Sequence, residues 1–330
     1  MRILVLGGTG VISRAIVREG LLAGHDMVML NRGRRKASFD FQPETIAADW
    51  SDPEQFCEKT AGVEADAVID MLSRTPEDAR RTLTAFGGET GQWIFTSTTC
   101  AYKKPFAKYP IRESEAERWD DPAYPYAYGK ARMEEYVLGQ DRAACAPVTV
   151  IRPSLTFGEG CANIGLLRQN ANILRRIRQG KPLLLYDDGC TALTFTFAPD
   201  LARGYLACCL NPRAYWQDFH ITSRNCVPFY RLYEALGKIA GRKPHFRYMK
   251  SEKLFALDPA RFDHVWYEKR FSHIFSLDKI KTTAPDWKPV ISLEAGLKHM
   301  AQWWETLENP YDEEKDALED RLCAMAESKD

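Results

Sequence analysis

Residues 2–17 read RILVLGGTGVISRAIV, in which a short apolar strand passes through a glycine turn directly into a helix. Gly7 permits a tight turn, and Gly10 lets the backbone approach a pyrophosphate. The first turn of the helix offers unpaired N–H groups and a favourable dipole to the same anion. Ser13 replaces the third glycine of the usual spacing and is small enough to keep helix and strand close. The stretch therefore predicts a dinucleotide-binding turn; the alternative is a purely structural turn.

The first 158 residues alternate short apolar runs with helix-length segments. Such alternation indicates a parallel sheet covered by helices on both faces. We therefore expect an α/β protein with a doubly wound parallel (Rossmann) sheet and a ligand at the carboxyl ends of its strands. The expected strands are 2–6, 27–30, 45–48, 67–70, 93–97 and 148–151, and the expected helices are 11–23, 53–60, 76–86 and 125–139.

Beyond residue 158 the alternation becomes irregular, which indicates a smaller domain of mixed structure. The sequence predicts a nucleotide-binding domain over 1–158 and a substrate-binding region over 159–310, with some segments packing back on the first sheet. The charged residues 311–330 form a tail, interpreted as a solvated helix or a frayed end. Expected helices are 163–179, 199–210, 228–240 and 292–306, and expected strands are 183–185, 193–197 and 217–221.

The composition limits the kinds of partner. The 330 residues carry 45 basic and 45 acidic side chains, a balance that argues against broad nucleic-acid binding or adhesion to an anionic membrane. No apolar run reaches the roughly 20 residues that span a bilayer, and the N-terminus lacks a signal-peptide pattern, so we expect a cytoplasmic protein. Nine dispersed cysteines indicate reduced thiols, and the absence of a Cys/His motif predicts no metal site.

The end of the second expected strand helps to distinguish NAD from NADP as the cofactor. An acidic residue there would bind the adenosine ribose hydroxyls, but the sequence has Asn31 followed by RGRRK at 32–36. Guanidinium groups such as those of Arg32 and Arg35 match the geometry of a 2′-phosphate. The pattern favours NADP over NAD; the alternative is a solvated basic loop.

A second motif, YPYAYGKARMEEYV at 124–137, has three tyrosines shortly before a lysine. Only Tyr126 stands four residues before Lys130, and on a helix this spacing puts two side chains on one face. A cation one turn from a phenol lowers the pKa of that phenol, so Tyr126 is the candidate acid or base. The same spacing between Tyr311 and Lys315 lies in the charged tail and is interpreted as accidental.

These motifs resemble the extended short-chain dehydrogenases/reductases of the NAD(P)-dependent epimerase/dehydratase family. The landmarks follow the family's order: the glycine turn, AADWSD, AVIDML, FTSTTCAY, YAYGK, RPSLTFG, FAPDLARGYL and SLDKIKTTAPDWKP. The resemblance implies cofactor contacts by Gly7, Thr9, Gly10, Val11, Ile12, Asn31, Arg32, Arg35, Asp49, Trp50, Met71, Leu72, Tyr126, Lys130, Pro153 and Leu155.

The resemblance also implies a catalytic set of Thr98, Tyr126 and Lys130, with Ser97 and Thr99 as alternatives to Thr98. Tyr126 would take the proton of a substrate hydroxyl. Lys130 would lower the pKa of Tyr126 and hold the nicotinamide ribose, and Thr98 would bond the reacting oxygen. The implied reaction is reversible hydride transfer at a secondary alcohol or ketone of a sugar or sugar nucleotide.

Two departures from the family's pattern bear on the substrate. Dehydratases of the family carry Asp-Glu after the catalytic threonine, whereas Thr98 is followed by Thr99 and Cys100, which favours an epimerase or ketoreductase. Sugar-nucleotide epimerases often carry a diphosphate-binding arginine at the position of Leu193. The candidate replacements are Arg168, Arg175, Lys269 and Arg270.

Two other functions are considered. NRG at 31–33 and SLDKIK at 276–281 also resemble the chloroplast stem-loop-binding proteins, which bind RNA on this fold, and a cofactor-binding regulator without catalysis is the third possibility. The neutral charge and the Thr98, Tyr126 and Lys130 set argue against both. Because the family commonly dimerises through two helices, here 76–87 and 125–139, we expect a homodimer that binds neither nucleic acid nor membrane.

Overall fold

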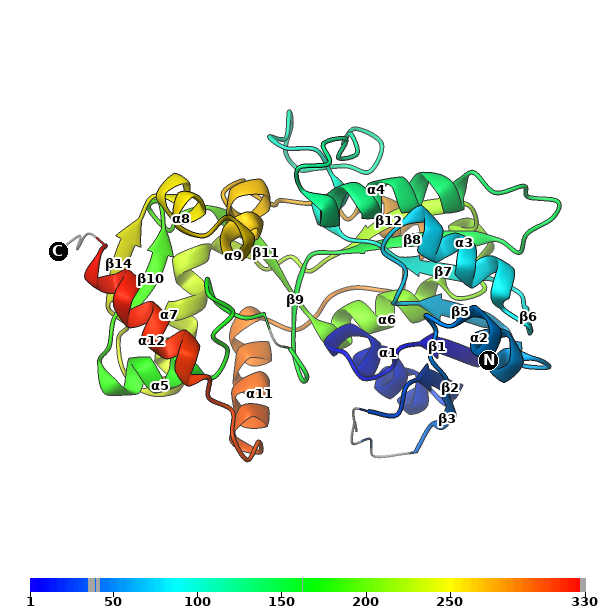
Figure 1. Ribbon diagram of the computed structural model, residues 1–330, viewed down its shortest axis with the longest axis horizontal. Coiled ribbons are helices and arrows are strands. Elements are labelled where there is room, and N and C mark those ends of the chain that lie inside the picture. The colour runs from blue at the N-terminus through cyan, green and yellow to red at the C-terminus, as the bar shows by residue number, and fades with distance from the viewer. Residues whose placement is uncertain (35–38, 40–41, 162, 327–330) are drawn as a thin grey trace.

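The computed structural model describes residues 1–34, 39, 42–161 and 163–326, and its largest element is a seven-stranded sheet (Figure 1). The strand order is β12-β8-β7-β5-β1-β2-β3, and every neighbouring pair is parallel. This arrangement confirms the expected doubly wound α/β fold, whose order reverses beside β1. The strands are β1 (Arg2–Leu6), β2 (Asp26–Asn31), β3 (Glu44–Ala47), β5 (Ala67–Asp70), β7 (Trp93–Thr96), β8 (Val148–Pro153) and β12 (Gln217–Ile221).

Helices cover both faces of this sheet because successive side chains of a strand point to opposite sides. Ile3 and Val5 of β1 belong to the core under α1 and α6. Leu4 and Leu6 belong to the core under α2, α3 and α4. All four side chains are fully buried, which explains the uninterrupted apolar run of this strand. The covering helices are α1 (Val11–Leu22), α2 (Pro53–Thr60), α3 (Pro76–Ala85), α4 (Pro125–Leu138) and α6 (Ala198–Cys208).

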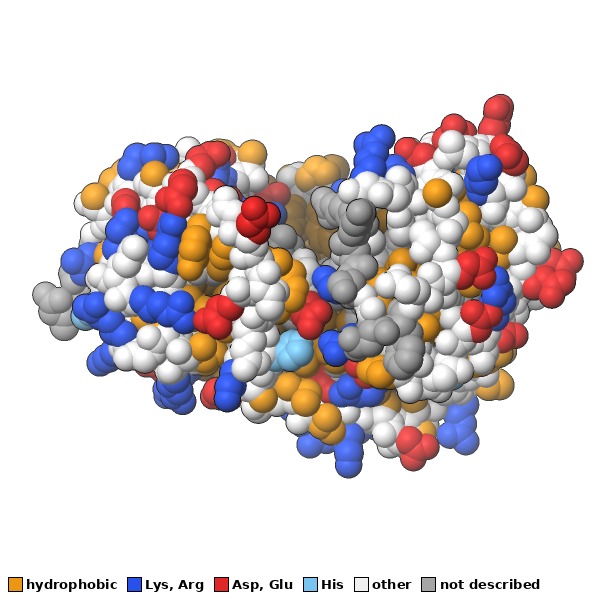
Figure 2. Space-filling view, turned by 90° about the horizontal axis from the view of Figure 1, so that it is seen from below, with side chains coloured by type: hydrophobic (Ala, Val, Ile, Leu, Met, Phe, Trp, Pro, Cys, Tyr) orange, Lys and Arg blue, Asp and Glu red, His pale blue; other side chains and the backbone are white. Residues whose placement is uncertain are grey.

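The second half of the chain packs around a core of its own beside the sheet (Figure 1). Seen from below, the surface is hollowed between the two halves (Figure 2). The smaller strands are β4 (Glu64–Ala65), β6 (Glu89–Thr90), β9 (Leu155–Phe157), β10 (Leu183–Tyr186), β11 (Ala192–Phe197), β13 (Cys226–Pro228) and β14 (Phe246–Met249). The remaining helices are α5 (Asn172–Gln179), α7 (Phe229–Ala240), α8 (Ser251–Leu257), α9 (Pro259–His264), α10 (Asp278–Thr283), α11 (Leu293–Glu305) and α12 (Glu313–Ala324). Short helical turns are η1 (Thr99–Ala101), η2 (Pro212–Ala214) and the π-helical η3 (Val265–Lys269).

Two segments from beyond residue 158 complete the large sheet. β12 pairs with β8 along its whole length, from Gln217 opposite Thr149 to Ile221 opposite Pro153. α6 packs against α1 and covers the same face of the sheet. The first sheet is therefore assembled from both halves of the sequence.

The expected helix over 163–179 is wrong in its first half, because only Asn172–Gln179 is helical. Gly165, Arg168 and Asn170 have φ angles of 91°, 55° and 53°. A right-handed helix requires negative φ, so these residues form an irregular loop. This loop brings Arg168 to the site described below.

The charged tail is neither frayed nor fully solvated over the described residues. α12 lies against β10 and buries one face on the second core. The buried Arg176 of α5 pairs with Asp316 at 3.0 Å and with Glu319 at 3.2 Å. The positive charge on α5 thus lets the acidic helix α12 pack inside the molecule. The composition of α12 alone does not indicate this packing.

Within the described ranges, no helix is both long enough and apolar enough to cross a membrane. The same residues contain no group of three or more metal-binding side chains placed to hold an ion. All nine cysteines are free.

Candidate active site

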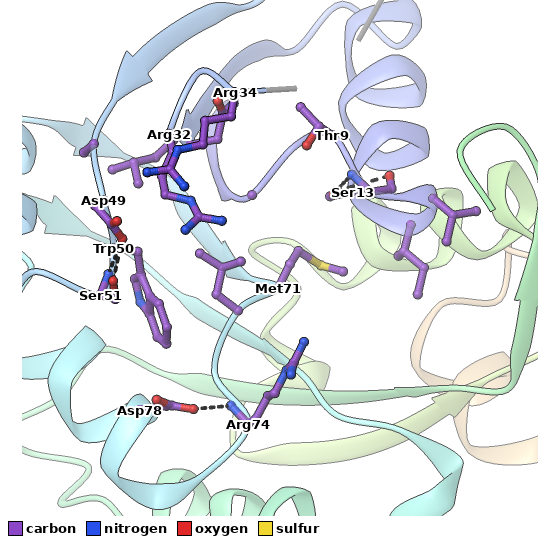
Figure 3. Close-up of a pocket in the computed structure, with 18 residues that line it drawn as sticks. Thr9, Ser13, Arg32, Arg34, Asp49, Trp50, Ser51, Met71, Arg74 and Asp78 are labelled. Carbon is purple, nitrogen blue, oxygen red and sulfur yellow. Dashed lines mark hydrogen bonds between the residues drawn. The ribbon is translucent and has the colours of Figure 1, made fainter. Parts of the chain in front are cut away.

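A cleft runs along the carboxyl ends of the central strands, and its outer part is a cavity of about 860 Å³ at the glycine turn (Figure 3). This turn cavity continues into an inner cavity, since Val11, Ile12, Met71 and Arg74 line both. Arg35 lies outside the described residues. The predicted cofactor residues that line the turn cavity are Gly7, Thr9, Gly10, Val11, Ile12, Asn31, Arg32, Asp49, Trp50, Met71 and Leu72.

The glycine turn is shaped to present backbone donors to the turn cavity. Gly7 and Gly8 have φ angles of 124° and 102°, a region that favours glycine. A Cβ on Gly8 would lie 2.4 Å from the sulfur of Met29. Gly10 caps α1 and donates its N–H to Ser13 Oγ at 3.0 Å, and the first turn of α1 carries no acidic residue. The positive end of α1 therefore meets the cavity without a competing carboxylate, which fits a pyrophosphate.

Charged side chains surround the far end of the turn cavity. Figure 3 shows Arg32 and Arg34 near Asp49 and Trp50. The Asp49 carboxylate accepts hydrogen bonds from the Ser51 hydroxyl at 2.6 Å and the Ser51 N–H at 3.0 Å. These bonds, with the two arginines, lower the pKa of Asp49, so the carboxylate is ionised. An acceptor and two guanidinium groups are thus available to an adenosine and its phosphate.

The inner cavity, of about 580 Å³, brings the three predicted catalytic residues together. Thr98 follows β7, while Tyr126 and Lys130 lie on α4 one turn apart. Pro153 and Leu155 line the same cavity, beside the loop between β8 and β9. The inner cavity therefore places hydroxyl, phenol and ammonium groups at the end of the dinucleotide cleft.

The hydroxyls near the end of β7 have different surroundings. Ser97 Oγ donates a buried hydrogen bond to the Glu134 carboxylate of α4, so its proton is not available to a substrate. Thr98 Oγ1 accepts the N–H of Cys100 at 3.1 Å, and its hydroxyl lies close enough to the Tyr126 phenol to lower the pKa of that phenol. This contact favours Thr98 over Ser97 as the group beside the phenol.

The three tyrosines at the start of α4 also differ. Tyr124 is buried and stacks on Tyr267 with ring centroids 5.1 Å apart. The guanidinium of Arg132 lies 5.6 Å from the ring centroid of Tyr128. Tyr126 is 43% exposed and lines the inner cavity. Tyr124 is therefore a packing residue, and Tyr126 is the one of the three that combines exposure with contact to Thr98.

The expected effect of Lys130 on Tyr126 is wrong for this structure. Lys130 is 4% exposed and donates to the carbonyl oxygens of Ser73 at 2.6 Å and Thr96 at 2.5 Å. Burial lowers the pKa of Lys130 to about 8. Although 43% of the surface of Tyr126 is exposed, the groups that line the inner cavity desolvate its phenol, and this chiefly raises the pKa of Tyr126 well above its usual range. The Lys130 ammonium serves two carbonyls and does not offset this shift. The cation that lowers the pKa of Tyr126 is Arg74.

Arg74 is a site residue that the sequence did not reveal. Its backbone N–H is held by Asp78 Oδ2 at 2.9 Å, and its side chain extends into the cleft (Figure 3). It lines both cavities, and its guanidinium makes no hydrogen bond or ion pair with any described residue. The position directly before the helix-capping Thr75 marks a loop at the end of a strand, but nothing in the sequence indicates where the side chain points.

The inner end of the cleft adds polar residues from the second half of the chain. The loop before α5 contributes Arg168, and the stretch from α9 to η3 contributes His264, Glu268 and Lys269. π-Helical turns are rare and occur often at functional sites. Leu193, at the position of the family's arginine, is fully buried in β11 and cannot reach the cleft.

Comparison with known proteins places the chain in a family. Residues 3–221 match the NAD dependent epimerase/dehydratase family, to which the chain therefore belongs. It is an NAD(P)-dependent oxidoreductase or epimerase of the short-chain dehydrogenase/reductase type. It is 26% identical over 289 residues to 2′-dehydrokanamycin reductase of Streptomyces kanamyceticus, covering 87% of this chain and 80% of that protein.

Other relatives differ in their named functions. UDP-glucuronate 4-epimerase of Thermodesulfobacterium geofontis is 26% identical, and the match spans 56% of this chain and about half (51%) of that protein. A chloroplast stem-loop binding protein of Arabidopsis thaliana is 24% identical over 90% of this chain and 77% of that protein. Identities at this level leave the substrate open.

Solved structures share the fold. An epimerase of Methanothermobacter thermautotrophicus has a TM-score of 0.74 at 18% identity, covering 92% of each chain. UDP-glucose 4-epimerase of Thermus thermophilus, in complex with NAD, has a TM-score of 0.70 at 17% identity over 93% of this chain and 99% of that chain. RMD of Pseudomonas aeruginosa, complexed with NADPH, has a TM-score of 0.69 at 20% identity over the same shares.

Proposed function

We propose that the protein is an epimerase or ketoreductase that transfers a hydride reversibly at a secondary alcohol or ketone of a sugar or sugar-nucleotide-like substrate. The observation that carries this proposal is the position of Thr98, Tyr126 and Lys130 at the inner end of a dinucleotide-shaped cleft. Two relatives, a 2′-dehydrokanamycin reductase and a UDP-glucuronate 4-epimerase, are named for reactions of this kind.

In this mechanism the chain's own residues control the proton and the position of the substrate. A bound nicotinamide supplies the hydride acceptor or donor. Tyr126 moves a proton to or from the reacting oxygen, and Thr98, which lies beside Tyr126 in the inner cavity, orients that oxygen. Lys130 fixes α4 to the ends of β5 and β7 through Ser73 and Thr96 and offers its remaining proton to the ribose.

The cofactor is proposed to be NADP, with NAD as the alternative. Support comes from Arg32 and Arg34 at the end of β2, where the neutral Asn31 stands in place of the acidic residue that would bind the ribose hydroxyls of NAD. Asn31 Oδ1 instead accepts the N–H of Gly33 at 2.8 Å and shapes the loop. Fluorescence titration should show NADPH binding more tightly than NADH, and an equal or reversed order would assign NAD.

Dehydration is disfavoured by the groups that follow Thr98. Thr99 has no acidic function, and burial raises the pKa of the Cys100 thiol, which keeps it protonated. Incubation of the purified protein with NADP(H) or NAD(H) and UDP-linked and free sugars, followed by NMR of the sugars and absorbance of the reduced cofactor, tests the proposal. Net redox turnover or interconversion of sugar epimers supports it, whereas salt-sensitive RNA binding without any turnover would support the RNA-binding alternative.

A further inference from the structure

Lys269 is an unusually placed cation at the inner end of the cleft. It ends the π-helical turn η3, lines the inner cavity and is only 5% exposed. Its ammonium makes no hydrogen bond or ion pair with any residue that the structure describes. Burying a cation without a partner reduces the stability of the folded protein, because the charge loses its hydration. Such a group is retained at a cavity wall when something that enters the cavity pairs with it.

Arg168 supplies a second positive charge to the same cavity. The loop that replaces the first half of the expected helix holds this exposed residue at a positive φ of 55°. Its guanidinium has no partner among the described residues either, and it lies close enough to lower the pKa of Lys269. Burial is the main cause of that shift, which brings the pKa of Lys269 to about 8.

The neighbouring groups do not cancel this charge. Glu268 stabilises the charged form of Lys269 and lies close enough to Cys100 to raise the pKa of its thiol. Burial lowers the pKa of His264, so the imidazole is neutral, and its Nδ1 lacks a partner within the described chain. Lys269, Arg168 and the single carboxylate of Glu268 leave this end of the inner cavity with a net positive charge, which suits an anion and opposes a polycation.

The other basic candidates are occupied elsewhere. Arg175 pairs with Glu313 and stacks 4.5 Å from the ring centroid of Tyr311. Arg270 stacks 3.6 Å from the ring centroid of Trp266. Neither lines the inner cavity. Of the four basic residues considered as replacements for the arginine missing at Leu193, only Arg168 and Lys269 face the cleft.

We propose that Lys269 and Arg168 bind an acidic group, a phosphate or a carboxylate, on the substrate whose hydride transfer is proposed above. Glu268 and Cys100 both act on the pKa of Tyr126, so this end of the cavity adjoins the phenol. The acidic group is therefore carried by the reacting sugar itself, close to the reacting carbon, and a remote nucleoside diphosphate is not required.

Ligand binding to the NADPH-saturated protein tests this proposal without turnover. The probes are glucuronate, glucose 6-phosphate, UDP and neutral glucose, measured by calorimetry. We expect at least one sugar acid to bind ten or more times tighter than glucose. Lys269→Met and Arg168→Gln should each abolish most of this difference, while Lys269→Arg should preserve it. Arg270→Gln, a change at the adjacent residue outside the cavity, is the matched control.

The pH dependence separates Lys269 from its neighbours. The ionisable groups around it are Arg168, His264, Glu268, His273, Cys100 and Cys161. Because its ammonium is protonated below a pKa of about 8, sugar-acid affinity should be full at pH 7 and fall as the pH rises past that value. The Lys269→Arg protein should retain its affinity at alkaline pH, since a guanidinium does not deprotonate there.

Several results of the binding experiments would overturn the proposed acid-binding site. Equal binding of glucose and both sugar acids, no detectable binding of either acid, or unchanged binding in Lys269→Met protein that is folded by circular dichroism would overturn the proposal. Tight binding of UDP alone would also overturn it, because the acidic group would then belong to a nucleotide. Lys269-dependent acid binding with neither redox turnover nor epimerisation of the sugar acids would overturn the proposed reaction but leave the acid-binding site standing.

Discussion

Tyr126 differs from the neighbouring Tyr124 and Tyr128 in what its hydroxyl meets. Aromatic neighbours enclose Tyr124, and an arginine covers Tyr128, but Tyr126 opens to the inner cavity beside Thr98. The spacing to Lys130 is enough to select Tyr126 from the sequence. It does not describe the electrostatics, because Lys130 donates to two carbonyls and the phenol is influenced by Arg74 instead.

Removing the hydroxyl of Tyr126 should stop proton transfer. We expect Tyr126→Phe to lower kcat by a factor of roughly 100 or more, in line with general acid–base catalysis, while NADPH affinity changes little. Steady-state kinetics and fluorescence titration measure the two quantities. Tyr128→Phe is the matched control and should keep most activity; a reversed result would mean that the wrong ring has been chosen.

Arg74 should influence both the cofactor and the phenol. Arg74→Leu removes a charged donor from the cleft, so we expect NADPH affinity to fall roughly tenfold, the value of one charge-assisted hydrogen bond. The loss also raises the pKa of Tyr126 further, so the pH–rate profile should move toward alkaline pH. Arg80→Leu on the outside of α3 is the control, and a profile unchanged by Arg74→Leu would contradict the assignment.

The sequence predicted those site residues that stand a few positions apart in one motif, as in the glycine turn and the Tyr126–Lys130 pair. It could not be predicted where a long side chain must cross a cavity. Arg74 follows β5, and Lys269 ends a π-helical turn nearly two hundred residues later, yet both line the inner cavity. No local sequence pattern predicts that these two side chains line the same cavity.

Among the secondary-structure elements, strands and helices with clear periodicity were predicted well, and the exceptions have physical causes. The apolar runs of β1, β5 and β7 are buried on both faces of the sheet. The loop at 163–171 looks helical by composition, but three positive φ angles prevent a helix. The charges of α12 indicated a solvated helix, but its buried Asp316 and Glu319 lie against Arg176 of α5 inside the second core.

The packing of α12 predicts a pH effect on stability. Burial raises the pKa of Glu319 to about 7, so the folded protein holds a proton that the unfolded chain releases above a pKa of about 4.5. The stabilisation by this group is present below pH 4.5 and is lost as the pH rises through 7. Glu319→Gln cannot titrate, so its stability relative to the wild type should increase between pH 5 and pH 7.5.

Urea unfolding at the two pH values measures this difference. Glu313→Gln on the exposed face of the same helix should show no such trend. A constant difference between the Glu319→Gln protein and the wild type would mean that Glu319 is ionised throughout this range.

At the scale of the whole molecule, the large sheet and the second half of the chain depend on each other. α6 and β12 come from residues 198–221. Without them one edge of the sheet is unpaired, and α1 alone covers the face that it shares with α6. A fragment of residues 1–158 should therefore expose the apolar surface that α6 covers, including the underside of Ile3 and Val5. Circular dichroism, light scattering and dye binding of this fragment should show an aggregating, poorly ordered protein; a stable, soluble monomer would contradict this view.

β12 lies far after its partner β8 in the sequence, and this order has a consequence for synthesis on the ribosome. Translation exposes β8 as an unpaired edge as soon as it emerges, and its partner follows only after more than sixty further residues. Open strand edges invite pairing with other nascent chains. A cell that makes this protein in quantity should thus need a holding chaperone during that interval, and slowing translation just before residue 217 should lengthen the period of risk.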